Sequence, residues 1–259
     1  ILWLMPIHPI GQEGIKEPLG SYYSPKDYYE VNPEFGTMSD FDHFLATAHE
    51  KGFKVILDWV ANHTSRDAAW TVEHPEWYYH DSTGALATQY DWTDIAQLNY
   101  ENTPDMWEAM IEAMKFWVAK GIDGYRCDVA SGPPTEFWNK ARKALEEVKS
   151  DVFMIAEAEQ PDLQVNAFDE YYTWMQKDVW YALAAGEVGI DSLTRFYQNY
   201  AVISGMPEGT IPMNFITNHD QNSWTGTTHE LYGNNIIPFT AMTYLLPGMP
   251  MLYTGDEIC

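Results

Sequence analysis

The sequence predicts an α/β fold, a TIM (β/α)8 barrel that is incomplete and runs from the second barrel strand to the eighth. Two observations support this prediction. Short apolar runs alternate with longer segments of helical periodicity along the 259 residues, an order that implies a parallel sheet with right-handed crossovers. Acidic residues also stand at the ends of several apolar runs, where the active sites of such barrels lie.

Seven segments are expected to be strands, because each is a short apolar run and not a helical pattern. In chain order these segments are 1–5, 54–59, 122–128, 152–157, 167–172, 212–217 and 250–253. The chain starts inside the first of these runs and stops just after the last. We therefore expect a fragment that lacks the first barrel strand and the last helix, together with any signal peptide.

Helical patterns separate the predicted strands. Ser39 has the character of an N-cap and Gly52 that of a C-terminal stop, so a helix is expected between them. Pro104 in a first turn and Gly121 at the end bound a second helix, whose buried residues recur at helical spacing. Further helices are expected at about 134–149, 175–186, 190–203 and 234–246.

Residues 64–99 interrupt this alternation. The segment is polar and irregular, rich in His, Asp, Trp and Tyr, and long for a loop in a compact domain. We expect it to be a functional excursion or a small subdomain. The barrel itself would then comprise residues 1–63 and 100–259.

Composition excludes some function classes. With 38 acidic residues against 14 basic ones, the formal net charge is −24, which repels nucleic acid and anionic membranes but is compatible with a neutral substrate. No apolar run approaches the ~20 residues that a membrane span requires. Aromatic residues form 15% of the chain, including 11 Trp and 17 Tyr. Most are expected in the core, and the remainder can stack on sugar rings.

Motifs for metal, phosphate and serine chemistry are absent from the sequence. Cys127 and Cys259 are far apart and are expected to be free thiols. There is no His-x-x-x-His or Cys-x-x-Cys spacing, so a zinc centre is not expected. A glycine-rich phosphate loop and a Gly-x-Ser-x-Gly elbow are also missing. Oxygen ligands for a hard cation are a better match, with Asn62 as one candidate.

Two carboxylates at neighbouring strand ends suit cleavage of a glycosidic bond with retention, which needs a nucleophile and an acid about 5–5.5 Å apart. Asp128 ends the run 122–128, and Arg126, two residues earlier, points to the same face and should lower its pKa. The alternative is an ordinary Arg–Asp structural pair. Glu157 ends the next run after an apolar approach that favours a protonated general acid. The alternative is a solvated glutamate.

Two further pairs involve histidine. Asp220 follows His219 after the run 212–217 and is suited to hold sugar hydroxyls and to stabilise positive charge in a transition state, although such a residue can also cap a helix. His63 follows the run that carries Asp58. A His–Asp pair on neighbouring strands can bind two adjacent hydroxyls of a pyranose.

Four segments in this order resemble the signature regions of the α-amylase family, glycoside hydrolase family 13. They are Asp-Trp-Val-Ala-Asn-His (58–63), Gly-Tyr-Arg-Cys-Asp (124–128), Ile-Ala-Glu (155–157) and Phe-Ile-Thr-Asn-His-Asp (215–220). Weaker matches cover nearly the whole chain, at 2–7, 20–29, 32–37, 96–100 and 251–257.

The resemblance implies a role for each candidate residue. Asp128 would be the nucleophile, Glu157 the acid/base and Asp220 the transition-state stabiliser. The remaining roles would be orientation of the nucleophile by Arg126, hydroxyl binding by His63 and His219, ring stacking by Tyr23 and support by Asp58. Residues 64–99 would form a short domain B, after the third barrel strand.

Two departures from the family pattern bear on whether the protein binds calcium. Ser131 and Gly132 stand where many α-amylases carry Lys-His, and Asn218 stands where glutamate is common. No cofactor is required for the chemistry, and a structural calcium ion at Asn62 is an option that the resemblance leaves open.

The resemblance implies a retaining glycoside hydrolase that cleaves α-glucosidic bonds, mainly α-1,4, in starch-like α-glucans or maltooligosaccharides through a covalent glycosyl-enzyme. The alternatives are a transglycosylase or glucanotransferase, an α-1,6-acting or oligosaccharide-specific member of the same family, and a non-catalytic carbohydrate-binding relative. The expected partner is the glucan, without nucleic acid or a membrane span. An extracellular or periplasmic location is favoured if starch is the substrate, and the oligomeric state is not indicated.

Overall fold

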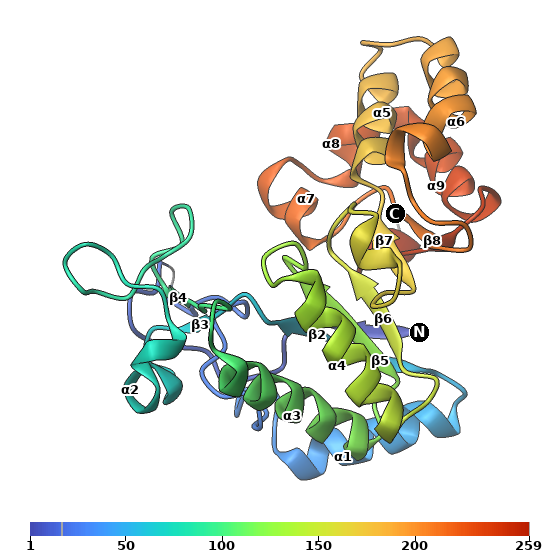
Figure 1. Ribbon diagram of the computed structural model, residues 1–259. Helices are drawn as coiled ribbons and strands as arrows, with labels where there is room; N and C mark the ends of the chain where they lie inside the picture. The colour runs from blue at the N-terminus through green and yellow to red at the C-terminus, as the bar shows by residue number, and fades with distance from the viewer. Residues whose placement is uncertain (17, 259) are drawn as a thin grey trace. The chain divides into compact units, whose positions relative to one another are not determined.

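The computed structural model describes residues 1–16 and 18–258, and the chain divides into two compact units that are described here separately. The first unit comprises Ile1–Glu157 and Asn166–Phe168, and the second comprises Ala158–Val165 and Asp169–Cys259. Figure 1 colours the chain from its N-terminus to its C-terminus. Cys127 is a free, buried cysteine, as predicted, whereas Cys259 lies outside the described residues.

The first unit contains parallel strands followed by helices. Its strands, in spatial order, are β1 (Leu2–Leu4), β2 (Val55–Val60), β5 (Gly124–Asp128) and β6 (Phe153–Ala156). Its long helices are α1 (Met38–Glu50), α3 (Pro104–Lys120) and α4 (Thr135–Val148). Helices α3 and α4 pack side by side (Figure 1). All four strands lie within predicted runs or one residue beyond them.

The start of α1 corrects one prediction. Thr37, not Ser39, is the N-cap, since its hydroxyl accepts the backbone N–H of Asp40 and the Asp40 carboxylate accepts the N–H of Thr37 at 2.8 Å. This reciprocal capping box satisfies two N–H groups that would otherwise lack partners. The predicted end of α3 is confirmed, because Gly121 adopts a left-handed conformation with φ 112°.

Buried aromatic side chains hold the loops that follow the strands. The indole of Trp138 on α4 donates to the carbonyl of Ala130 at 2.8 Å. The hydroxyl of Tyr100 donates to the Ala61 carbonyl at 2.6 Å, and that of Tyr28 donates to the Val60 carbonyl at 2.7 Å. These bonds fix the backbone just beyond the ends of β2 and β5, which is where the candidate site lies.

The predicted excursion at 64–99 has secondary structure of its own. Strands β3 (His63–Ser65) and β4 (Ile95–Gln97) pair in antiparallel fashion, and the short helices α2 (Trp70–Glu73) and η1 (Pro75–Trp77) lie between them. Segment 64–99 is therefore structured and is not an open loop.

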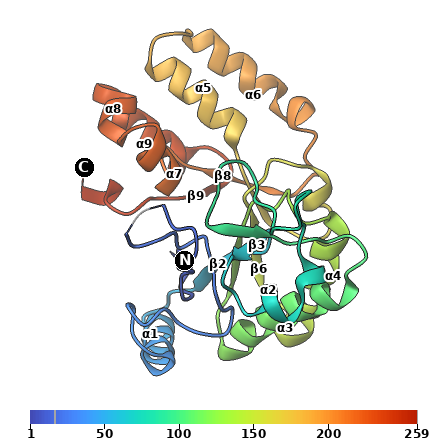
Figure 2. The same cartoon turned by 90° about the vertical axis from the view of Figure 1, so that its left-hand side faces the viewer.

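The second unit has parallel strands β7 (Glu170–Tyr172), β8 (Ile211–Asn214) and β9 (Met249–Pro250), in that order. Its helices are α5 (Trp174–Ala184), α6 (Ile190–Ser204), α7 (His219–Trp224), α8 (Thr228–Tyr232) and α9 (Ile236–Leu245), with short 3-10 turns η2 (Asp162–Gln164), η3 (Gly233–Asn235) and η4 (Asp256–Ile258). Figure 2 shows α5 and α6 running side by side. Helices α7 and α8 were not predicted. Among the helices of the described residues, none has the length and apolar character that a bilayer crossing demands.

Candidate active site

Arg126 is the centre of a buried cluster at the ends of β2, β5 and β6. One terminal nitrogen of its guanidinium lies 2.9 Å from Asp58 Oδ1 and 3.0 Å from Asp128 Oδ1, and the other lies 2.9 Å from Glu157 Oε1. Asp58 is in register with Arg126 across the parallel pair, and Asp128 follows two residues later, so the three side chains share one face of the sheet. The structure thus brings together four of the predicted site residues.

The surroundings of Glu157 differ from the apolar setting that the sequence predicts. One carboxyl oxygen is paired with Arg126, and the other accepts the backbone N–H of Val129 at 2.8 Å. Val129 has a positive φ of 41°, an uncommon conformation for a β-branched residue. The apolar residues before Glu157 precede it along β6, but its carboxyl reaches across to the end of β5.

The pKa of Asp128 also differs from the prediction. Burial raises the pKa of Asp128 well above its ordinary value, and the negative charge of Glu157 raises it further, so the opposing effect of Arg126 is outweighed. Burial likewise raises the pKa of Asp58 to about 6, against the opposing contacts with Arg126 and Tyr23. A single guanidinium therefore does not balance three buried carboxyls. The raised pKa of Asp128 opposes the ionised form that a nucleophile requires.

Two aromatic residues complete the cluster. The Tyr23 hydroxyl donates to Asp58 Oδ2 at 2.9 Å, and the Trp3 indole N–H donates to the same oxygen at 3.2 Å. The guanidinium carbon of Arg126 lies 5.2 Å from the Trp3 ring centre and 5.9 Å from that of Tyr23. Sequence reasoning included Tyr23 but missed Trp3. The available signal was an indole N–H on the strand beside the one that carries Asp58.

His63 is buried and has protein partners at both ring nitrogens. Nε2 lies 2.8 Å from the Tyr23 carbonyl oxygen, and Nδ1 lies 3.1 Å from Asn62 Nδ2. Burial lowers the pKa of His63 to about 4, so its ring is neutral near pH 7. In this arrangement His63 braces the loop that carries Tyr23.

Asn62, the candidate calcium ligand, is buried beside the loop that follows β5. Its amide nitrogen donates to Gln89 Oε1 at 2.6 Å, and its Oδ1 lies so close to Gly132 that an added Cβ there would clash. A calcium ion takes six to eight oxygen ligands, and Asn62 would supply one of them through Oδ1.

His219 and Asp220 lie in the second unit, in the first turn of α7. Asn218 is the N-cap of this helix, since its side-chain oxygen accepts the N–H of Gln221 at 2.8 Å. Asp220 Oδ2 lies 3.4 Å from His219 Nε2 and accepts from Asn218 Nδ2 at 3.4 Å. The capping role considered for Asp220 therefore belongs to Asn218.

Comparisons with known proteins give consistent results. A family model described as the α-amylase catalytic domain matches residues 1–76 and 71–259. The crystal structure of a maltogenic α-amylase from Thermotoga neapolitana is 34% identical with a TM-score of 0.90, over 98% of this chain and 59% of that one. Its similarity over nearly the whole chain confirms the predicted fold class, an incomplete (β/α)8 barrel.

Two curated relatives differ in the activity that their names state. α-Amylase 3 of Dictyoglomus thermophilum is 28% identical over 99% of this chain and 56% of its own length. An α-1,4-glucan:maltose-1-phosphate maltosyltransferase of Salinibacter ruber is 30% identical over 61% of this chain and 28% of its own length. The chain spans less than two thirds of the length of each of these three proteins.

Proposed function

Because the chain belongs to the α-amylase family, glycoside hydrolase family 13, we propose that the intact protein is a retaining glycosidase of starch-like α-glucans or maltooligosaccharides, acting mainly on α-1,4 bonds. The observation that supports this most directly is the single guanidinium of Arg126, which contacts the carboxyls of Asp128 and Glu157 from adjacent strands. Double displacement requires two carboxyls that flank the scissile bond, and this contact keeps the two close together.

In the first displacement, ionised Asp128 attacks the anomeric carbon of the substrate while the bond from that carbon to the glycosidic oxygen breaks. Glu157 gives its proton to the departing oxygen, which leaves as a sugar hydroxyl. The products are a glycosyl ester on Asp128 and an ionised Glu157. Burial and the neighbouring Glu157 raise the pKa of Asp128, so this step needs the pair to carry its proton on Glu157, whose carboxyl contacts the same guanidinium.

In the second displacement, Glu157 takes a proton from a water molecule. The water oxygen bonds to the anomeric carbon, and the ester bond to Asp128 breaks. Both carboxyls return to their starting states, with Asp128 ionised and Glu157 protonated. Two inversions give net retention, so the first product has the α configuration.

Other residues position the reacting groups. We assign Asp220 to stabilise the positive charge of the transition state and His219 to bind a hydroxyl of the sugar. Tyr23 provides an aromatic face for the sugar ring while its hydroxyl holds Asp58. Arg126 keeps Asp128 oriented, and His63 supports the backbone of Tyr23 and can contact a hydroxyl only after rearrangement.

Substitution of the two carboxyls tests the proposal. Asp128→Asn and Glu157→Gln should each lower turnover of a soluble starch by several orders of magnitude while circular dichroism shows an intact fold, because one removes the nucleophile and the other the proton donor. Glu146→Gln removes an exposed carboxylate on α4 and should retain the wild-type rate. Near-normal turnover in either site variant, or a β-configured first product by proton NMR, would reject the assignment.

A second candidate function keeps the first displacement and changes the acceptor. The similarity to a maltosyltransferase supports transglycosylation as the second candidate. A sugar hydroxyl in place of water gives transfer without any change in the carboxyl pair. Product analysis of maltoheptaose digests separates the two. Simple hydrolysis gives only shorter oligosaccharides, whereas products longer than maltoheptaose indicate transglycosylation.

A further inference from the structure

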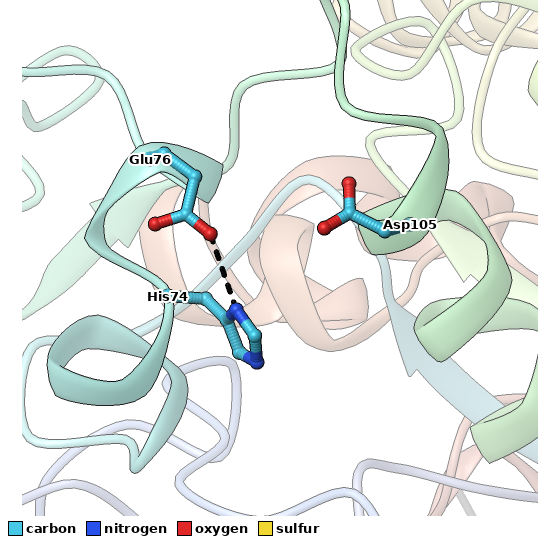
Figure 3. Close-up of side chains that lie close together, drawn as sticks. All are labelled: His74, Glu76 and Asp105. Carbon is cyan, nitrogen blue, oxygen red and sulfur yellow. Dashed lines mark hydrogen bonds and ion pairs between the residues drawn. The ribbon is translucent and has the colours of Figure 1, made fainter.

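His74, Glu76 and Asp105 bring three metal-ligating side chains together outside the candidate active site (Figure 3). His74 Nδ1 lies 3.1 Å from Glu76 Oε1, and one ligand atom of each residue lies within 4.8 Å of the other two. We propose that these residues form a binding site for a divalent transition-metal ion, with zinc as the ion whose coordination they fit best.

A single buried tryptophan orients two of the three ligands. The His74 ring stacks on Trp77, with ring centres 3.9 Å apart and planes 6° from parallel. The Trp77 indole N–H donates to Asp105 Oδ2 at 3.0 Å, and Trp77 is only 4% exposed. Supporting contacts of this kind hold imidazole and carboxylate ligands in place in metal sites.

The donor types point to a transition metal and not to calcium. One imidazole and two carboxylates supply a nitrogen and oxygens, which are donor types that zinc accepts, and three ligands leave a fourth position for water. Calcium and magnesium prefer oxygen ligands alone. With a neutral histidine, the two carboxylates carry a charge of −2, which a divalent ion balances.

The two carboxylates also lack a basic partner. Within residues 1–16 and 18–258, neither Glu76 nor Asp105 forms an ion pair with lysine or arginine, and the nitrogen-bearing side chain beside Glu76 is His74. Elsewhere in this unit, buried carboxylates form ion pairs with Arg126, Lys54 or Lys149. A bound cation would supply the positive charge that this cluster lacks.

The spacing requires a small adjustment. Ligand atoms of a tetrahedral zinc ion lie ~3.3 Å apart, from zinc–ligand distances of about 2.0 Å. The widest separation here is up to 4.8 Å, so side chains must move by ~1 Å to close on an ion. The Glu76 side chain is 61% exposed and that of His74 40%, so both can move and an ion can enter from solvent.

The site would join two elements that are distant in the sequence. His74 and Glu76 belong to the turn around η1 in segment 64–99, whereas Asp105 lies in the first turn of α3. An ion held by all three would fasten this segment to the helix that follows it. The bound ion should therefore stabilise the folded protein.

Titration of the metal-stripped protein with zinc chloride tests the proposal. At about pH 7.5, calorimetry should show one zinc ion bound per chain, with a rise in the melting temperature. His74→Gln and Asp105→Asn should each weaken binding by about tenfold or more, and Asp105→Asn retains a side-chain oxygen for the Trp77 N–H.

Two controls keep the test specific. His80→Gln removes an exposed histidine of the same segment and should leave zinc binding unchanged. Calcium chloride at the same concentration should give no heat at this site. The proposal is overturned if millimolar zinc does not bind, or if it binds equally well to the wild type, His74→Gln and Asp105→Asn.

Discussion

At the scale of single residues, the positive charge of Arg126 allows three buried carboxyls to lie side by side. Its side chain is fully buried and contacts Asp58, Asp128 and Glu157. The pKa of Asp58 is about 6 in the folded chain and ~4 when unfolded, so folding takes up a proton between these values. The stabilising contribution of Asp58 is therefore complete below about pH 4 and is lost as the pH rises through about 6.

Arg126→Met is expected to lower the free energy of unfolding by about 3–5 kcal/mol at about pH 7, because it leaves buried negative charge without a partner. The loss should shrink toward about pH 5, because Asp58, with a pKa of about 6, takes up a proton in the folded state. Denaturant unfolding at both pH values measures the difference. Lys115→Met, which removes an exposed pair with Glu112, should leave the unfolding free energy unchanged. A loss of equal size at both pH values would contradict this account.

Prediction of the site from sequence succeeded where spacing alone carries the information. The two-residue step from Arg126 to Asp128 places both side chains on one face, and the structure confirms their contact. The predicted direction of the Asp128 pKa shift was wrong. Burial and the approach of Glu157 raise this pKa, and both depend on the tertiary structure. Trp3 was missed for a related reason, since its contact with Asp58 depends on the register that pairs Trp3 with Ile56, and register is also a tertiary property.

At the scale of elements, Asp123 joins the starts of β2 and β5 to two helices. Its carboxylate accepts the Val55 N–H at 2.9 Å and lies 2.9 Å from Lys54 Nζ, 2.8 Å from His49 Nε2 at the end of α1, and 3.3 Å from Lys149 Nζ at the end of α4. Burial raises the pKa of Asp123, but these donors outweigh it and bring the pKa to about 2. The ionised form therefore stabilises the packing of these elements above about pH 4.

Asp123→Asn should lower the free energy of unfolding by about 1–2 kcal/mol near neutral pH, after allowance for the exposure of the lysines. Because the pKa is depressed on folding, the contribution of Asp123 is lost as the pH falls from about 4 toward 2. The gap between variant and wild type should thus narrow between about pH 4 and pH 3 in denaturant titrations. Asp151→Asn, at an exposed carboxylate beside Lys149, is the matched control and should show no gap. A gap that widens in acid would refute the assignment.

The elements themselves were predictable to different degrees. All seven predicted runs overlap strands, because each combines apolar residues with short length, but β9 shares only Pro250 with the run 250–253. The N-cap of α1 was misplaced because Thr37 and Ser39 are both good caps and each has an aspartate three residues later. Helices α7 and α8 were missed since they are too short for a periodic pattern, although the Thr227–Glu230 capping box was a readable signal for α8. The His74 cluster escaped notice because its third ligand belongs to another element.

At the scale of the whole molecule, the order of motifs predicted the family and the fold, but it does not separate hydrolysis from transfer. In the proposed mechanism both reactions pass through the same ester on Asp128, so they would share their catalytic residues. The choice depends on whether water or a sugar hydroxyl reaches the ester, which is decided by the shape of the loops around the site. Motif residues carry little information about that shape.

The net charge of −24 gives a prediction that concerns all 259 residues together. Like charges repel within the compact fold and are more widely spaced in the unfolded chain, so low ionic strength should favour unfolding. Screening lengths fall from about 30 Å at 0.01 M salt to about 10 Å at 0.1 M. The melting temperature at neutral pH should therefore rise by several degrees when sodium chloride increases from about 0.01 M to about 0.3 M, as followed by calorimetry.

Near the sequence pI of 4.4 the net charge vanishes, so the same salt step should leave the melting temperature almost unchanged. A rise of equal size at both pH values would mean that salt acts through apolar burial and not through charge.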